Sequence, residues 1–148
     1  MPTGLALRAL RDVNVLTALL DGSHAFHAAA MAWLATHGRD GWASCPIMQN
    51  GCVRVMASAG YPAPRPAWEV AERLRLATVD ESHEFWADGV SVLDPAVVRL
   101  DRIHGARQLT DACLLALAVR QGGRLVTFDR AVPWQAVPGA TAAHLVVL

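Results

Sequence analysis

The sequence predicts an α/β fold with a mainly parallel central sheet. Short apolar segments at 42–45, 124–128 and 144–148 are typical of strands. Segments with helical spacing of apolar residues alternate with them, which is the order of βαβ units. The chain has 148 residues, of which 53% are hydrophobic and 18% charged, so a packed core can form. We expect a single domain over residues 1–148, with ligands bound outside the carboxyl ends of the strands.

The first half of the chain alternates short strands and helices. Residues 5–13 read as a first strand, although Arg8 and Arg11 make it a poor buried one. Helical spacing of Phe26, Ala30 and Trp33 indicates a helix, and Pro46 suits a first helical turn. The expected elements are a strand over 5–13, helices over 14–20 and 24–36, a strand over 42–45, and a helix from 46 to 59.

The second half follows the same alternation after a loop rich in Gly and Pro. Thr110 is a natural N-cap for a helix that is apolar nearly all round, and Gly122 and Gly123 would end that helix. Such a helix should be buried on most sides. The expected elements are a loop over 60–66, helices over 67–77, 95–104 and 110–121, and strands over 89–93, 124–128 and 144–148.

Composition excludes several classes of enzyme. The formal net charge is zero, so no global basic field attracts nucleic acid. The chain has no lysine, which P-loop nucleotide sites and Schiff-base enzymes need. Receiver domains and haloacid-dehalogenase phosphatases also gather aspartates at a sheet edge, but they normally carry a lysine there. The missing lysine therefore argues against a function as a phosphatase or a receiver-like domain.

The cysteines and the apolar runs indicate a cytoplasmic protein. Cys45, Cys52 and Cys113 form no CxxC pair, and three cysteines cannot make a full disulfide framework. The longest uncharged apolar run, 112–119, is too short to span a bilayer. Arg8 and Arg11 interrupt the apolar N-terminal stretch, which argues against a signal peptide. We expect no membrane association.

Three aspartates stand where the chain leaves a strand or enters a helix. Asp12 and Asp129 follow predicted strands, and Asp111 lies in the first turn of the predicted helix 110–121. Each alone has an ordinary structural explanation, as a cap, a favourable charge at a helix dipole or a turn residue. If the segments pack into one sheet, however, the three carboxylates meet at its edge. Their repulsion is relieved by a divalent cation such as Mg²⁺, with Mn²⁺ as the alternative.

Several segments resemble the PIN-domain family, specifically the VapC-type toxin ribonucleases. They are "DVNVLTALLDGSHAFHAAAMAWLA", "CPIMQNGCVRVM", "HEFW" and "TDACLLALAVRQGGRLVTFDR", and the resemblance runs from about residue 10 to 135. It implies a three-layer α/β/α sandwich with a mainly parallel sheet. It also implies an endoribonuclease that depends on Mg²⁺ or Mn²⁺, a homodimer, an RNA substrate and inhibition by a cognate antitoxin.

The resemblance also assigns residues of this chain. Asp12, Asp111 and Asp129 match the family's acidic residues for catalysis and metal binding. We expect a second group to contact substrate or to support the metal ligands: Asn14, Gln49, Thr127 and Arg130.

Gln49 departs from the family pattern, because many members carry glutamate there. A glutamine leaves three negative charges in the site instead of four, so we expect weaker metal binding. Gln49→Glu should then raise metal affinity or activity.

Two functions remain open from the sequence. The first is a toxin endoribonuclease that cleaves RNA with a metal-activated water. The second is a catalytically weakened PIN-like domain that binds RNA or protein, having lost a carboxylate at Gln49. The three remaining aspartates favour the first, and a metal-dependent cleavage assay separates them. Trp86 and Trp134 fall in polar stretches and are candidates for antitoxin or dimer contacts.

Overall fold

A parallel β-sheet forms the centre of the molecule in a computed structural model that describes residues 7–148. In that part of the chain the sheet has five strands in the order β3-β2-β1-β4-β5, and each neighbouring pair is parallel. The strands are β1 (Ala9–Arg11), β2 (Trp42–Ser44), β3 (His83–Phe85), β4 (Arg124–Thr127) and β5 (Leu145–Val147). Because all strands run the same way, their carboxyl ends share one edge.

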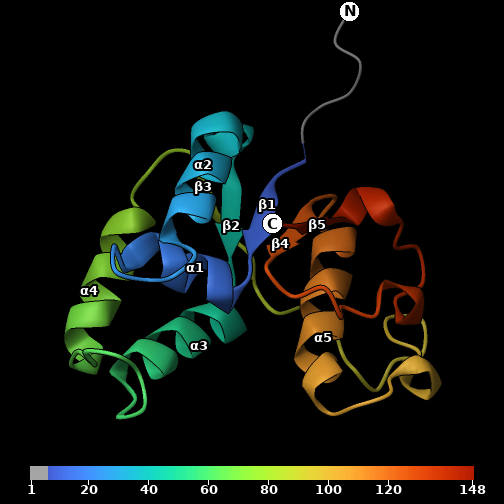
Figure 1. Ribbon diagram of the computed structural model, residues 1–148. Coiled ribbons are helices and arrows are strands. Elements are labelled where there is room, and N and C mark those ends of the chain that lie inside the picture. Colours follow the sequence, from blue (N-terminus) through green and yellow to red (C-terminus); the bar gives the residue numbers. More distant parts are fainter. Residues whose placement is uncertain (1–6) are drawn as a thin grey trace, which may run out of the picture.

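Helices cover both faces of the sheet. Figure 1 shows α5 on one side of the strands and α1 and α2 on the other, with α3 and α4 beside them. The α-helices within residues 7–148 are α1 (Val13–Leu20), α2 (His27–His37), α3 (Pro46–Ala57), α4 (Ala67–Ala77) and α5 (Arg107–Arg120). This arrangement confirms the predicted α/β fold with a parallel sheet.

The local sequence explains where these helices begin and end. Asp12 caps α1, and Pro46 occupies the first turn of α3, where its missing N–H costs nothing. The chain leaves α5 through Gly122, whose φ of 70° lies in the left-handed region. Short 3₁₀ turns complete the chain at Gly38–Asp40, Leu100–Arg102, Trp134–Ala136 and Ala142–His144.

The main hydrophobic cluster joins the sheet to α5 and also includes buried residues of α3 and α4. Leu10 and Leu125 pair in neighbouring strands and are both fully buried. They belong to one apolar cluster with α5, whose residues 114–118 are all buried. A smaller cluster of Ala9, Val15 and Val126 lies under α1. The sheet is thereby packed between two helical layers.

The structure corrects two of the predicted elements. Residues 89–93 form no strand, and 95–104 contain only the 3₁₀ turn Leu100–Arg102 in place of a helix. The valines of the first segment have strand propensity, but no neighbouring strand is available to pair with them. The segment 95–104 buries Val98 and packs Val97 and Ile103 against the core, but only Leu100–Arg102 takes a helical turn.

Other boundaries differ from the prediction. The first strand is restricted to Ala9–Arg11, and the part of its predicted range before residue 7 lies outside the described residues. The helix predicted to start at Thr110 begins at Arg107, so Thr110 is no N-cap. Within residues 7–148, no helix is long and apolar enough to cross a membrane.

The segment "HEFW" forms the edge strand β3 and a buried tryptophan. Trp86 is 3% exposed and its indole N–H donates to Glu84 at 2.8 Å. Trp86 lies in the loop after β3, as expected, but its burial contradicts the expected contact with a partner. Trp134, in contrast, is 38% exposed in a 3₁₀ turn.

Candidate active site

The carboxyl ends of β1 and β4 bring Asp12 and Thr127 together. Arg11 pairs with Val126, so the next residue along each strand stands at the same level of the sheet. The Thr127 hydroxyl donates to Asp12 Oδ2 at 2.7 Å, and Asp12 Oδ1 accepts from the backbone N–H of Val13 at 2.7 Å. Asp12 is only 7% exposed, so these two bonds hold a nearly buried carboxylate in one orientation.

The Thr127 hydroxyl also connects Asn14 and Asp129. It accepts from the Asn14 side-chain amide at 3.3 Å and from the backbone N–H of Asp129 at 3.0 Å. Asn14 Oδ1 in turn accepts from the backbone N–H of Phe128 at 3.3 Å. One hydroxyl thus links β1, α1 and the turn after β4, and four of the predicted residues belong to this network.

Asp111 reaches the same place from α5. Its carboxyl lies within hydrogen-bonding reach of Asp129, and it is half-buried. Burial raises the pKa of Asp111 to about 7, and the negative charges of Asp12 and Asp129 contribute to the shift. Unfavourable interactions of this kind indicate carboxylates that share a site.

Burial also raises the pKa of Asp12. The hydrogen bonds from Thr127 and Val13 act against this shift, while the charge of Asp129 adds to it. The three predicted acids therefore interact as one electrostatic cluster, although they come from β1, α5 and the turn after β4.

The chemistry of this cluster suits a cation, but its geometry does not form a complete ligand shell. No arginine or histidine of residues 7–148 makes a salt bridge with any of the three carboxylates. In the same residues no three His, Cys, Asp or Glu side chains are arranged to hold a metal ion. The donors are hard, mutually repelling oxygens of the type that Mg²⁺ and Mn²⁺ prefer. A bound ion would need further oxygen ligands from water or substrate.

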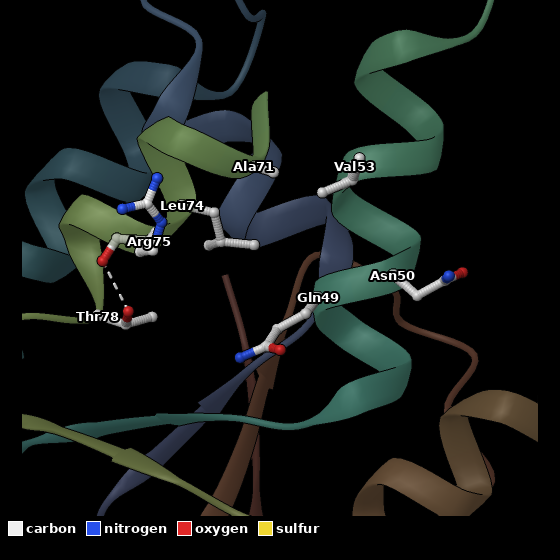
Figure 2. A pocket seen from close by; sticks show the side chains of 7 residues that line it. All are labelled: Gln49, Asn50, Val53, Ala71, Leu74, Arg75 and Thr78. Atoms are coloured by element: carbon white, nitrogen blue, oxygen red, sulfur yellow. Dashed lines mark hydrogen bonds between the residues drawn. The ribbon is translucent and has the colours of Figure 1, made fainter. Parts of the chain in front are cut away.

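Gln49 lies beside a different feature, a pocket of about 460 Å³ between α3 and α4. Figure 2 shows its amide facing Arg75 of α4 and Thr78, the residue that follows this helix, across the opening. The Gln49 Nε2 donates to Ser44 Oγ at 3.0 Å. The described part of the chain shows no hydrogen bond from Gln49 to the three aspartates. Its role in the metal site stays a prediction.

A polar chain that was not predicted continues from Ser44 to His83. Ser44 Oγ lies 2.8 Å from His83 Nε2, and the His83 ring stands 4.4 Å from Trp42 between ring centroids. Burial lowers the pKa of His83, a hydrogen bond to the Thr78 backbone raises it, and Arg11 lowers it further. Ser44 is fully buried, so it is no accessible nucleophile. The only signal in the sequence was "HEFW", and its pairing with β2 brings His83 to Ser44.

Arg130 follows Asp129 and is exposed. Within residues 7–148 it forms no salt bridge, and it lines a pocket to which none of the three aspartates contributes. Arginine at such a position suits recognition of phosphate.

These features define an α/β protein with an acidic site at the carboxyl edge of a parallel sheet. The PIN domain family model matches residues 9–138, and the chain belongs to this family.

Relatives in Mycobacterium tuberculosis are similar over most of their length. The chain is 50% identical over 142 residues to Ribonuclease VapC44 of strain H37Rv, covering 96% of this chain and 100% of the relative. It is 38% identical over 135 residues to Ribonuclease VapC39, covering 90% and 96% of the two chains. Ribonuclease VapC38 is 43% identical over 128 residues, covering 84% of this chain and 86% of its own.

Proposed function

We propose that this chain is a metal-dependent endoribonuclease that acts as the toxin of a toxin–antitoxin module. The observation that carries this proposal is the meeting of three carboxylates at the carboxyl edge of the sheet, where the Thr127 hydroxyl donates to Asp12 and accepts from the backbone N–H of Asp129. The raised pKa of Asp111, to which the charges of Asp12 and Asp129 contribute, agrees with this proximity. The similarity to relatives named ribonuclease VapC, over nearly the whole chain, supports the same activity.

Asp12, Asp111 and Asp129 would hold the ion through their carboxylate oxygens. Mg²⁺ is the proposed ion and Mn²⁺ the alternative. A bound divalent ion offsets the repulsion between RNA phosphate and carboxylates and lowers the pKa of a water molecule. Deprotonation of Asp111, whose pKa is raised to about 7, would accompany its binding.

The remaining residues of the network position the acids and contact the substrate. Thr127 and Asn14 fix the orientation of Asp12 and of the turn that carries Asp129, so the acids need little reorganisation. Arg130 would contact a phosphate of the RNA from the exposed rim.

The proposal includes two protein partners. A toxin of this kind is paired with a cognate antitoxin, and we propose a homodimer as its assembly. The names of the VapC relatives support the pairing with an antitoxin. Light scattering of the purified chain, alone and with the co-expressed neighbouring gene product, measures both assemblies.

The cleavage assay uses the purified chain and a panel of structured RNAs in EDTA, Mg²⁺ or Mn²⁺. Cleavage is expected only with a divalent ion. Asp111→Asn and Asp129→Asn should abolish it because each removes an ionic ligand. Asp101→Asn is the matched control, since Asp101 is exposed and pairs with Arg99 away from the cluster.

Two results would contradict the proposal. One is full cleavage by both site variants when circular dichroism shows that they are folded. The other is RNA binding by the wild-type chain without cleavage under any ion, which would favour the binding-module alternative.

A further inference from the structure

Arg11 is a buried cation without a partner. It is 7% exposed, and in the described part of the chain its guanidinium makes no hydrogen bond and no salt bridge. Its Nε is completely buried and has no acceptor. Its guanidinium carbon lies over the Trp42 ring, 4.2 Å from the ring centroid, which compensates part of the burial. An unpaired buried charge is costly, so a group that supplies an acceptor here would be bound favourably.

The remaining exposed surface of Arg11 faces a pocket of about 430 Å³. The pocket lies on the α1 and α2 side of the sheet. It is lined by none of Asp12, Asp111 and Asp129, so it is separate from the carboxylate cluster. Its apolar walls come from Leu19, Met31, Leu34, Trp42 and Ala77.

The rim of the pocket carries a negative charge of its own. Asp80 lines it and attracts Arg11 electrostatically, but their separation exceeds that of a salt bridge. The Asp80 carboxylate instead accepts from the backbone N–H of Ser82 at 3.0 Å. This negative charge repels a polyanion such as RNA more strongly than it repels a single carboxylate with an apolar body.

The adjoining helix surface is apolar and uncovered. Eight of the eleven residues of α2 are apolar, yet only Ala30 is buried. Met31 is 42% exposed and borders the Arg11 pocket. At the end of α4, Leu76 and Val79 are 63% and 76% exposed. Apolar surface of this extent next to a pocket is typical of a protein-binding face.

We propose that the Arg11 pocket is a docking site for a partner polypeptide, which inserts one Asp or Glu carboxylate flanked by apolar side chains. The carboxylate would pair with the guanidinium, and the flanking side chains would cover α2 and the end of α4. Charge complementarity favours this occupant: the guanidinium of Arg11 lacks an ion pair within residues 7–148, the walls are mostly apolar, and the carboxylate of the lining residue Asp80 accepts from Ser82 instead. The antitoxin of the proposed function is the candidate partner; only that assignment depends on the proposed function.

The test titrates the full ¹⁵N-labelled chain with acetyl-Leu-Glu-Leu-amide. The Trp42 indole N–H and the Arg11 Nε–H resonances report on the pocket. A saturable shift of both is expected with this peptide, and acetyl-Leu-Gln-Leu-amide and inorganic phosphate should each bind at least about tenfold more weakly.

Two variants separate the pocket from a general effect. Arg11→Met replaces the unpaired charge with an apolar chain of similar length, so it should fold with an equal or higher Tm and lose the Trp42 shift. Asp80→Asn should bind the Glu peptide as tightly as the wild type or more tightly, because a rival negative charge is removed.

The outcomes decide the proposal without reference to RNA cleavage. Equal Trp42 shifts in the wild type and Arg11→Met, or tighter binding of phosphate than of the Glu peptide, would overturn it. Failure of the Glu peptide to bind would also overturn it. If Arg11→Met then shifts a monomer–dimer equilibrium, the pocket is instead a contact between copies of this chain.

Discussion

The hydroxyl of Thr127 donates to Asp12 Oδ2 across the boundary between β4 and β1, at 2.7 Å and out of contact with solvent. The same oxygen accepts from Asn14 and from the backbone of Asp129. One side chain with no charge therefore determines the geometry of two of the three acids.

Removal of this hydroxyl should destabilise the protein. Thr127→Val keeps the shape but leaves Asp12 with one fewer donor, which costs about 1–3 kcal/mol in the free energy of unfolding. The hydrogen bond from Thr127 also lowers the pKa of Asp12, so that pKa should rise in the variant. Urea denaturation and NMR titration of the Asp12 carboxyl measure the two effects.

Thr127→Ser is the matched control, since it retains the hydroxyl. It should keep the Asp12 pKa near the wild-type value, although loss of a methyl group lowers stability slightly. If Thr127→Val and Thr127→Ser gave the same Asp12 pKa, the hydrogen bond would not influence the acid.

Asp111 should make stability depend on pH in the absence of divalent ions. Its pKa is about 7 in the folded chain, against an ordinary value of 3.8. The folded state therefore binds the proton more tightly, so its contribution to stability is complete below pH 3.8 and is lost as the pH rises through 7. Asp111→Asn removes this dependence.

Denaturation in EDTA at pH 5 and pH 8 measures this effect. The free energy of unfolding of Asp111→Asn minus that of the wild type should be larger at pH 8 than at pH 5. Added Mg²⁺ should narrow the difference at pH 8, because the wild-type site then binds a cation in place of the proton. If the free energies of unfolding of the two proteins changed with pH in parallel, the stability of the wild type would not depend on protonation of Asp111.

The sequence predicted the elements whose local pattern agrees with their packing. The apolar helix ending at Gly122 and the strand Arg124–Thr127 are examples, and both are largely buried. Strand β3 could not be predicted in this way. Its residues are polar or exposed, and only pairing with β2, about 40 residues earlier in the chain, makes them a strand. Residues 89–93 are the opposite case: their local sequence favours a strand, but they pair with no neighbouring strand and form none.

The site residues also divide into those that the local sequence predicts and those that depend on tertiary pairing. Asp12 and Asp129 were predicted because each follows a predicted strand, and Asp111 because it lies in the first turn of the predicted helix 110–121. The hydrogen bond between Thr127 and Asp12 depends on strand register, which the sequence does not specify. Arg11 was expected to weaken its strand, but stacking on Trp42 from the neighbouring strand accommodates it.

Gln49→Glu should raise the pKa of His83. In the wild type, the Gln49 amide donates to Ser44, which leaves the Ser44 proton for His83 Nε2, while His83 also interacts with the Thr78 backbone. A carboxylate cannot donate, so Ser44 would donate to Glu at position 49 and His83 Nε2 would have to carry a proton. A new negative charge nearby acts in the same direction.

NMR titration of the His83 ring measures this shift, and Gln49→Met is its control because it removes the donor without adding a charge. Gln49→Glu also tests the metal site, by a Mn²⁺ titration. A rise in ion affinity would support a role for Gln49 in the cluster. Unchanged affinity with a raised His83 pKa would confine Gln49 to the chain of hydrogen bonds through Ser44.

Gly123 should tolerate no side chain, because the buried Trp86 occupies the space beside it. A Cβ at this position would lie 2.6 Å from the Arg8 carbonyl oxygen and 2.6 Å from the Trp86 ring. Since the first of these atoms belongs to the backbone, Gly123→Ala must displace the start of β1 or the indole, at a cost of about 1–3 kcal/mol. Gly60→Ala is the control, because a Cβ there meets nothing within 4 Å. Urea denaturation followed by tryptophan fluorescence should show a loss for the first variant alone. Equal stability of the two would mean that Trp86 is free to move and that its burial does not hold β3 against the sheet.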